Sequence, residues 1–212
     1  MIKAVLWDND GVLVDTEKLF FEATKNTLAS VGVELSRELF VEYSLIKGIG
    51  LREYLTHYNL DPGLYESLRK KRSTEYSRLL ETKTELIEGI NQTLNFLYDH
   101  YKMGIVTSSR KQHFEIIHKN TNILKYFKFV LTREDYRNSK PDPEPYLKGL
   151  DMIDVKPEEC IVIEDSARGL KSANRAGIFC LMIPNQLSSP ETYNGDYKLL
   201  NHSSEIIDFL PH

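Results

Sequence analysis

The chain has 212 residues, 41% of them hydrophobic, with a formal net charge of -4 at pH 7 and a pI near 5.9. A chain of this length can bury one sizeable core, with room for a small inserted unit. The acidic balance argues against a nucleic-acid-binding or membrane-surface protein, because such proteins usually carry a basic excess on one face. It favours a small-molecule partner, and we expect a monomer.

The compartment is predicted from what the chain lacks. No segment approaches the ~18 apolar residues that a membrane span needs, and no long apolar stretch follows Lys3. Cys160 and Cys180 each lie inside an apolar run, which indicates buried thiols in a reducing compartment rather than a disulfide or a metal pair. We therefore expect a cytoplasmic protein.

The first predicted element is a strand that ends in two acids. An apolar run up to Trp7 is followed by Asp8 and Asp10, and in an extended chain this spacing points both side chains to the same side. Gly11 lets the backbone turn away, so the acids should lie at the carboxyl end of a sheet, where open α/β folds bind ligands. Two like charges about 4 Å apart repel by roughly 4 kcal/mol at an effective dielectric of 20, so the site should hold a cation or keep one acid protonated.

A helical unit is predicted next. Residues 17–31 show apolar and small residues at a helical period, ended by Gly32. Further helical patterns cover about 37–46, 51–58 and 63–82, and no convincing strand lies between them. We therefore predict an all-helical cap over residues 16–85, inserted after the first strand.

Strands and helices alternate in the rest of the chain. A helix is predicted over about 89–99, and the Pro-rich stretch 140–145 predicts a loop feeding a helix, with Asp142 as its N-cap and Pro143 at its first position. Short apolar runs predict strands at 102–107, 127–131, 160–164, 180–183 and 197–200. Alternation of this kind implies a parallel sheet with right-handed crossovers. The predicted fold class is α/β, with a Rossmann-like parallel sheet core formed by residues 1–15 and 86–212 and an inserted all-helical cap.

Polar residues follow the predicted core strands. They are Asp8 and Asp10, Thr107 and Ser108, Lys140 in its loop, and Glu164 with Asp165. The carboxyl ends of parallel strands lie along one edge, so these groups should converge on one crevice. Four carboxylates and one lysine would reject a phosphate but would suit Mg²⁺, a hard cation that prefers oxygen ligands. With Mg²⁺ and Lys140 in place, an anionic phosphoryl group could bind.

These motifs resemble those of the haloacid dehalogenase superfamily, in the branch of β-phosphoglucomutase and its phosphatase relatives. The resemblance covers essentially the whole chain. Its motifs are Asp-x-Asp-Gly-Val at residues 8–12, a hydroxyl after an apolar strand at Thr107 with Ser108, Lys140 in Ser-Lys-Pro, and Glu164-Asp165 followed by Ser166 and Gly169.

The resemblance implies a role for each acid. Asp8 would be the nucleophile, and Asp10 the general acid and base. Mg²⁺ would be held by Asp8, the main-chain carbonyl of Asp10 and Asp165, with Glu164 nearby.

The chemistry of the residues agrees with these roles. A carboxylate nucleophile divides ester hydrolysis into formation and hydrolysis of an aspartyl-phosphate, and a second carboxyl can protonate the leaving alkoxide and later deprotonate water. Lys140, Thr107 and the backbone of Ser108 would stabilise charge on the transferring oxygens. Ser109 and Gln112 predict a capping box, so that a helix begins just behind Thr107.

Three further features bear on substrate and metal binding. The turn at residues 48–52 could dip into the crevice, which makes Arg52 or Lys47 a candidate substrate-binding residue; the alternative is a solvated loop. The basic run at 69–72 is predicted to be a solvated helix face. His113 and His118 are five residues apart, which does not fit a metal pair on a helix.

The first functional interpretation is a Mg²⁺-dependent phosphatase acting on a small phosphorylated metabolite, most simply a sugar phosphate. The second is a phosphomutase of the β-phosphoglucomutase kind. Against it, Phe20 lies where those mutases carry a histidine, and the spacing from Gly48 to Arg52 is one residue longer than theirs. A regulator that binds a phosphometabolite without turnover is a third interpretation, from a different class.

Overall fold

The computed structural model describes residues 1–188 and 192–210. Within them, six strands form one sheet in the order β3-β2-β1-β4-β5-β6. The strands are β1 (Ala4–Trp7), β2 (Lys102–Val106), β3 (Val130–Leu131), β4 (Cys160–Glu164), β5 (Phe179–Met182) and β6 (Tyr197–Leu199). Each pair of neighbours among these strands is parallel. The predicted α/β fold class is confirmed.

Strand β1 lies inside the sheet and is fully buried. Its last residue, Trp7, lies beside Ile105 of β2 and Ile163 of β4. Because these three strands are parallel and in register, the segments that follow them leave the sheet at the same edge. This edge brings together motifs that are far apart in the sequence.

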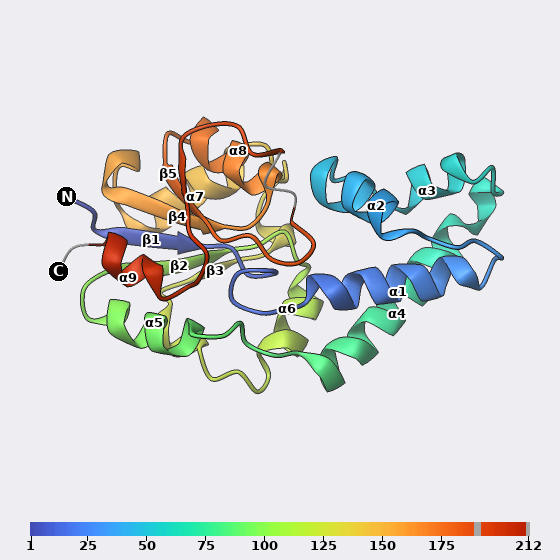
Figure 1. Cartoon of the computed structure of the whole chain (residues 1–212), viewed down its shortest axis with the longest axis horizontal. Coiled ribbons are helices and arrows are strands. Elements are labelled where there is room, and N and C mark those ends of the chain that lie inside the picture. Colours follow the sequence, from blue (N-terminus) through green and yellow to red (C-terminus); the bar gives the residue numbers. More distant parts are fainter. Residues whose placement is uncertain (189–191, 211–212) are drawn as a thin grey trace.

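Helices cover both faces of the sheet (Figure 1). Val5 and Trp7 belong to an apolar cluster with helices α5 (Ile90–Tyr98), α6 (Lys111–His118) and α9 (Glu205–Phe209). Ala4 and Leu6 belong to a second cluster, with α7 (Glu144–Ile153) and α8 (Ala167–Arg175). The alternation of side chains along β1 therefore supplies both cores.

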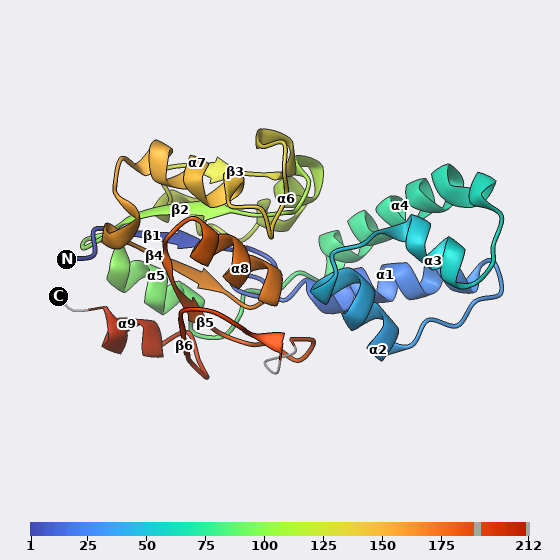
Figure 2. The ribbon, with the colours of Figure 1, turned by 90° about the horizontal axis from the view of Figure 1, so that it is seen from above.

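A second group of helices lies beyond the end of the sheet (Figures 1 and 2). These helices are α1 (Glu17–Ala29), α2 (Arg37–Phe40) with a π-helical continuation (Val41–Ile46), α3 (Leu51–His57) and α4 (Tyr65–Lys83). They bury their own apolar cluster, which includes Leu28, Phe40 and Tyr54. We refer to residues 16–85 as the cap.

Two connectors join the cap to the sheet, and they pair with each other. The Asp15 amide donates to the Glu85 carbonyl at 3.0 Å, and the Ile87 amide donates to the Leu13 carbonyl at 3.0 Å. Between them, Val14 and Leu86 form an antiparallel bridge. The chain therefore enters and leaves the cap at one place.

Two local predictions need correction. Helix α7 begins at Glu144 with Pro143 as its N-cap, one residue later than predicted, although Asp142 still accepts a hydrogen bond from the Glu144 amide at 2.9 Å. The predicted strand over 127–131 is reduced to Val130–Leu131. Cys160 and Cys180 are buried free thiols, as predicted. None of the helices in the described ranges is long and apolar enough to span a membrane.

Candidate active site

A cavity of about 360 Å³ lies where the carboxyl edge of the sheet meets the cap. Asp8, Asp10 and Asp165 line it from the sheet, and Phe20, Arg69 and Arg72 line it from helices α1 and α4. Acidic groups thus line the cavity from the sheet, while two cationic groups line it from the cap.

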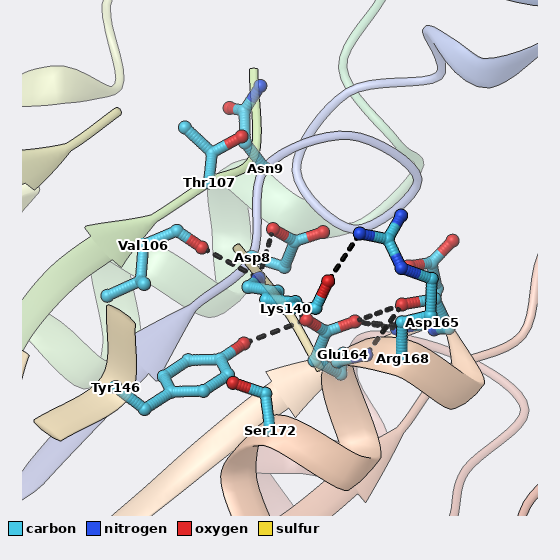
Figure 3. Close-up of polar contacts among 12 residues, drawn as sticks. Asp8, Asn9, Val106, Thr107, Lys140, Tyr146, Glu164, Asp165, Arg168 and Ser172 are labelled. Atoms are coloured by element: carbon cyan, nitrogen blue, oxygen red, sulfur yellow. Dashed lines mark hydrogen bonds and ion pairs between the residues drawn. The ribbon is translucent and has the colours of Figure 1, made fainter. Parts of the chain in front are cut away.

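Lys140 joins two of the acids at the sheet edge (Figure 3). Its ammonium nitrogen lies 2.7 Å from Oδ1 of Asp8, 2.7 Å from Oε1 of Glu164 and 2.9 Å from the Val106 carbonyl oxygen. These three acceptors use all three N–H groups of the ammonium. Lys140 is only 4% exposed, so its position is fixed by ion pairs that water barely screens.

The contacts of Lys140 with the two acids also shift the pKa values of all three groups. Burial and the negative charge of Glu164 raise the pKa of Asp8 to about 7, in spite of Lys140. Burial alone would lower the pKa of Lys140, but Asp8 and Glu164 outweigh it and raise that pKa above its ordinary value. Burial would raise the pKa of Glu164, whereas the Lys140 ammonium holds it below its ordinary value. Lys140 and Glu164 are therefore charged at neutral pH.

The acids fit a divalent cation. Asp8, Glu164 and Asp165 each offer a carboxylate oxygen, and these oxygens lie within 4.8 Å of one another. Burial, followed by the charge of Glu17, raises the pKa of Asp165 well above its ordinary value. Since one lysine does not balance this charge, a cation would complete the site, and an all-oxygen donor set fits a hard cation such as Mg²⁺. A ligand from the main-chain carbonyl of Asp10 stays a prediction.

Glu17 is a site residue that sequence reasoning missed. It is the first residue of α1 and lines the same cavity. Its Oε2 accepts a hydrogen bond from the Asn185 amide at 2.8 Å, and that amide also donates to Asp165 at 2.6 Å. Burial and the charge of Asp10 raise the pKa of Glu17 to about 8, although its bond from Asn185 opposes the shift. Its position as the first residue of the helix predicted over residues 17–31 was the available signal.

Asp10 is held by hydroxyl groups. Thr16, the N-cap of α1, donates to Oδ1 at 2.6 Å, and Thr107 donates to Oδ2 at 3.2 Å. Ser109 also donates to Oδ2, at 2.7 Å. The predicted capping box of Ser109 is therefore wrong: α6 begins at Lys111, and the Ser109 hydroxyl contacts Asp10 instead of capping the helix.

Most predicted site residues of the core meet at this cavity. Its lining includes Asp8, Asp10, Thr107, Ser108, Lys140 and Asp165. Glu164 is fully buried and reaches the site through Lys140.

The predicted cap residues behave differently. Lys47 and Arg52 are not among the described residues that line the cavity. Lys47 is half exposed and pairs with Glu42, and the Arg52 guanidinium lies 4.0 Å from the centre of the Tyr65 ring. In this conformation neither residue contacts the acidic group.

Two arginines of α4, rather than Lys47 and Arg52, line the cavity from the cap. Arg69 and Arg72 do so. The Arg69 side chain is still 39% exposed and pairs with Glu66, so the prediction of a solvated face is wrong only for Arg72, whose guanidinium is desolvated by burial. The Arg72 guanidinium lies 4.9 Å from the centre of the Phe20 ring. Their spacing to Ser73 and Tyr76, which also line the cavity, follows one face of a helix, and this pattern was the overlooked signal.

Residues 5–183 match the family model of the haloacid dehalogenase-like hydrolases. The chain belongs to this family. The resemblance predicted from the four motifs is thus confirmed, and this haloacid dehalogenase-like hydrolase is an enzyme.

Two proteins with similar sequences and one solved structure show which members of the family this chain resembles. The hydrolase is 34% identical to the phosphorylated carbohydrates phosphatase of Thermotoga maritima, over 84% of this chain and 82% of that protein. It is 28% identical to the beta-phosphoglucomutase of Bacillus subtilis, over 85% of this chain and 82% of that protein. Among solved structures, CbbY from Rhodobacter sphaeroides in complex with phosphate has a TM-score of 0.82 and 25% identity, covering 97% of this chain and 96% of that chain.

Proposed function

We propose that this hydrolase is a Mg²⁺-dependent phosphatase that cleaves a small phosphorylated carbohydrate through an aspartyl-phosphate on Asp8. The observation that carries the proposal is the Asp8 carboxylate, paired at 2.7 Å with buried Lys140 and opening on a cavity that Asp10 also lines. The similarity to a phosphatase of phosphorylated carbohydrates supports the substrate class.

In the first step, an Asp8 carboxylate oxygen attacks the phosphorus and the bond to the sugar oxygen breaks. Asp10, protonated, gives its proton to that oxygen, so the sugar leaves as an alcohol. In the second step, Asp10 takes a proton from water, which attacks the phosphorus and releases phosphate and the free Asp8 carboxylate. Asp10 is thereby protonated again, and the cycle closes.

Residues around the phosphoryl group would stabilise its charge. Lys140 is protonated and fixed by Asp8, Glu164 and Val106. Asp8, Glu164 and Asp165 would hold Mg²⁺, which supplies positive charge to the phosphoryl oxygens when bound. Thr107 and the Ser108 backbone would add hydrogen bonds.

The cap side of the cavity supports a polar substrate. Arg69 and Arg72 line the cavity from the cap, where Arg69 pairs with Glu66 at 2.9 Å, and Arg110 lines it from the core. Within the described residues no carboxylate forms an ion pair with Arg72. Guanidinium groups bind hydroxyl and anionic groups well, so we expect the part of the substrate that is not cleaved to carry them. Lys47 and Arg52 would contribute only in another conformation of the cap.

A phosphate-release assay tests the proposal. The purified protein is incubated with phosphorylated sugars and other small phosphate esters, with Mg²⁺ or with excess EDTA. We expect turnover with Mg²⁺, its loss with EDTA, and no turnover for Asp8→Asn. Full turnover in excess EDTA refutes the metal requirement. Binding of esters without phosphate release would instead favour a non-catalytic regulator.

A phosphomutase is the second candidate, favoured by the similarity to beta-phosphoglucomutase. Phe20 argues against it. Its ring packs at 5.2 Å from the Tyr76 ring and beneath Arg72, and a phenyl ring cannot exert hydrogen-bond control over Asp10. Water would then reach the phosphoenzyme before a sugar hydroxyl does.

A further inference from the structure

Asn9 stands between the two acids of the first motif but faces another way. It is fully buried, and its side chain lies beside Thr107, away from the group formed by Lys140 and Glu164 (Figure 3). The Asn9 amide nitrogen donates to Oδ2 of Asp10 at 3.2 Å, and the amide oxygen lies 2.7 Å from Nε2 of His118. No step proposed above uses Asn9 or His118.

The directions of these hydrogen bonds follow from their chemistry. The Asn9 amide oxygen can only accept, so Nε2 of His118 must carry the hydrogen. Burial lowers the pKa of His118 to about 4, in spite of the charge of Asp10, so the ring is neutral and Nδ1 carries no hydrogen. Nδ1 then accepts from the Thr121 hydroxyl at 2.8 Å. Each donor in this series points toward Asp10.

The Asn9 amide differs from the other groups that hold Asp10. The hydroxyls of Thr16, Thr107 and Ser109 can rotate to donate or to accept, so they tolerate a charged or a protonated carboxyl. The Asn9 N–H group can only donate, and His118 prevents the amide from turning over. This N–H group therefore holds Oδ2 with a donor that cannot reverse, and it fixes the rotation of the Asp10 carboxyl.

We propose that Asn9, held in place by His118, is a positioning residue that fixes the Asp10 carboxyl for proton transfer to the leaving oxygen. The role rests on the proposed function. In the transfer, the O–H bond of the Asp10 carboxyl breaks, the proton forms the hydroxyl of the leaving sugar, and Asp10 remains as a carboxylate that still accepts from Asn9.

The test compares two phosphate esters whose leaving groups differ in their need for a proton. An alkyl phosphate needs its leaving oxygen protonated, whereas p-nitrophenol leaves as an anion. The rate of phosphoenzyme formation is measured by rapid quench with both esters, because the acid role of Asp10 acts only in that step. The variants are Asn9→Leu, His118→Leu, the double variant, and His118→Gln, whose amide can still donate to Asn9.

We expect Asn9→Leu and His118→Leu to slow phosphoenzyme formation from the alkyl phosphate by ~10- to 100-fold, a part of the usual effect of acid catalysis. With p-nitrophenyl phosphate the change should stay within about 3-fold. The double variant should be no slower than Asn9→Leu, and His118→Gln should keep most of the wild-type rate. Equal slowing with both esters, or a slow His118→Gln, overturns the proposal.

The protonation of the His118 ring in the wild-type protein can be measured by NMR, and this test does not depend on whether a variant folds. In the ¹⁵N-labelled protein we expect His118 to be neutral with its hydrogen on Nε2. A hydrogen on Nδ1 would reverse the series and overturn the proposal. If the wild type forms no phosphoenzyme from either ester, the proposed function itself fails and this role falls with it. Phosphoenzyme formation without leaving-group dependence in the variants refutes the positioning role alone.

Discussion

The backbone of Gly48 in the cap lies directly against the guanidinium of Arg168 in the core. A Cβ atom at residue 48 would fall 2.2 Å from Cζ of Arg168, and Gly48 has a φ of +62°. Arg168 also donates to the carbonyl oxygen of Lys140. The cap loop, Arg168 and the backbone of the active-site lysine are therefore in contact in this conformation.

Gly48→Ala should impair activity more than stability. Its added methyl group must displace Arg168 or the loop, and a displacement of about 1 Å near an active site can cost up to ~10²-fold in rate. Gly32→Ala is a matched control, because Gly32 has a φ of +78° but a Cβ atom added there would meet nothing within 4 Å. Both substitutions carry a backbone cost of roughly 1–2 kcal/mol. Steady-state kinetics with an alkyl phosphate should distinguish them, and equal kcat/KM values would contradict the role of this contact.

Substitutions of Asp8 and Asp10 should impair different steps of the reaction. Asp8→Asn removes the nucleophile and should abolish phosphoenzyme formation. Asp10→Asn keeps the nucleophile and should slow turnover by about 10²- to 10⁴-fold, the usual range for acid–base catalysis. Acid quench with a ³²P-labelled ester measures the phosphoenzyme directly. An equal burst from the two variants would contradict the assigned roles.

Lys140→Met should destabilise the metal-free protein by about 3–5 kcal/mol, because it leaves the charges of Asp8 and Glu164 buried without their partner. Lys83→Met is the control, since Lys83 pairs at 3.0 Å with Glu22 and both side chains are at least 40% exposed. Loss of such a surface pair should cost at most about 1 kcal/mol. Urea unfolding in EDTA measures both, and equal losses would show that the buried pair is not needed.

The metal-free protein should lose stability as pH rises from about 4.5 to 8. The pKa of Glu17 is raised from 4.5 to about 8 in the folded state, so over this range the folded state binds more protons than the unfolded state. Through Glu17 alone, each pH unit then removes up to ~1.4 kcal/mol, and the raised pKa values of Asp8 and Asp165 act in the same direction. Glu17→Gln should flatten this dependence in urea unfolding with EDTA. An unchanged slope would mean that Glu17 is not the group responsible.

The product separates a phosphatase from a mutase. With β-glucose 1-phosphate, a bisphosphate primer and Mg²⁺, we expect mainly free phosphate, because Phe20 offers no hydrogen bond with which to delay attack by water. A coupled assay for glucose 6-phosphate run beside a phosphate assay measures both products. Substantial primer-dependent glucose 6-phosphate with little phosphate would make the mutase the correct interpretation.

The core of the site could be predicted because it depends on topology. Asp8 and Thr107 each follow an apolar strand and Glu164 ends one, and parallel strands bring their carboxyl ends to one edge whatever the length of the chain between them. Lys140 could be added from its motif. None of these placements depends on how the cap packs.

The cap side could not be predicted in the same way. The spacing of Arg72 with Tyr76 marks one face of α4, but which faces of α3 and α4 turn toward the sheet, and so whether Arg52 or Arg72 reaches the cavity, is a tertiary relationship. Ser109 was assigned wrongly for a related reason. A serine hydroxyl can cap a helix or bind a carboxylate, and the choice depends on Asp10, which is 99 residues away in the chain.

The paired connectors between Leu13 and Ile87 make the entry and exit of the cap a single short ladder. Antiparallel neighbours lie about 5 Å apart, so the core meets the cap as two chain ends side by side, fixed by the hydrogen bonds of Asp15 and Ile87. A cap that enters and leaves at one ladder can turn about it as a unit. Such a turn would move Glu17 and Gly48 relative to Asp165 and Arg168, so the ladder sets how the two halves of the cavity meet.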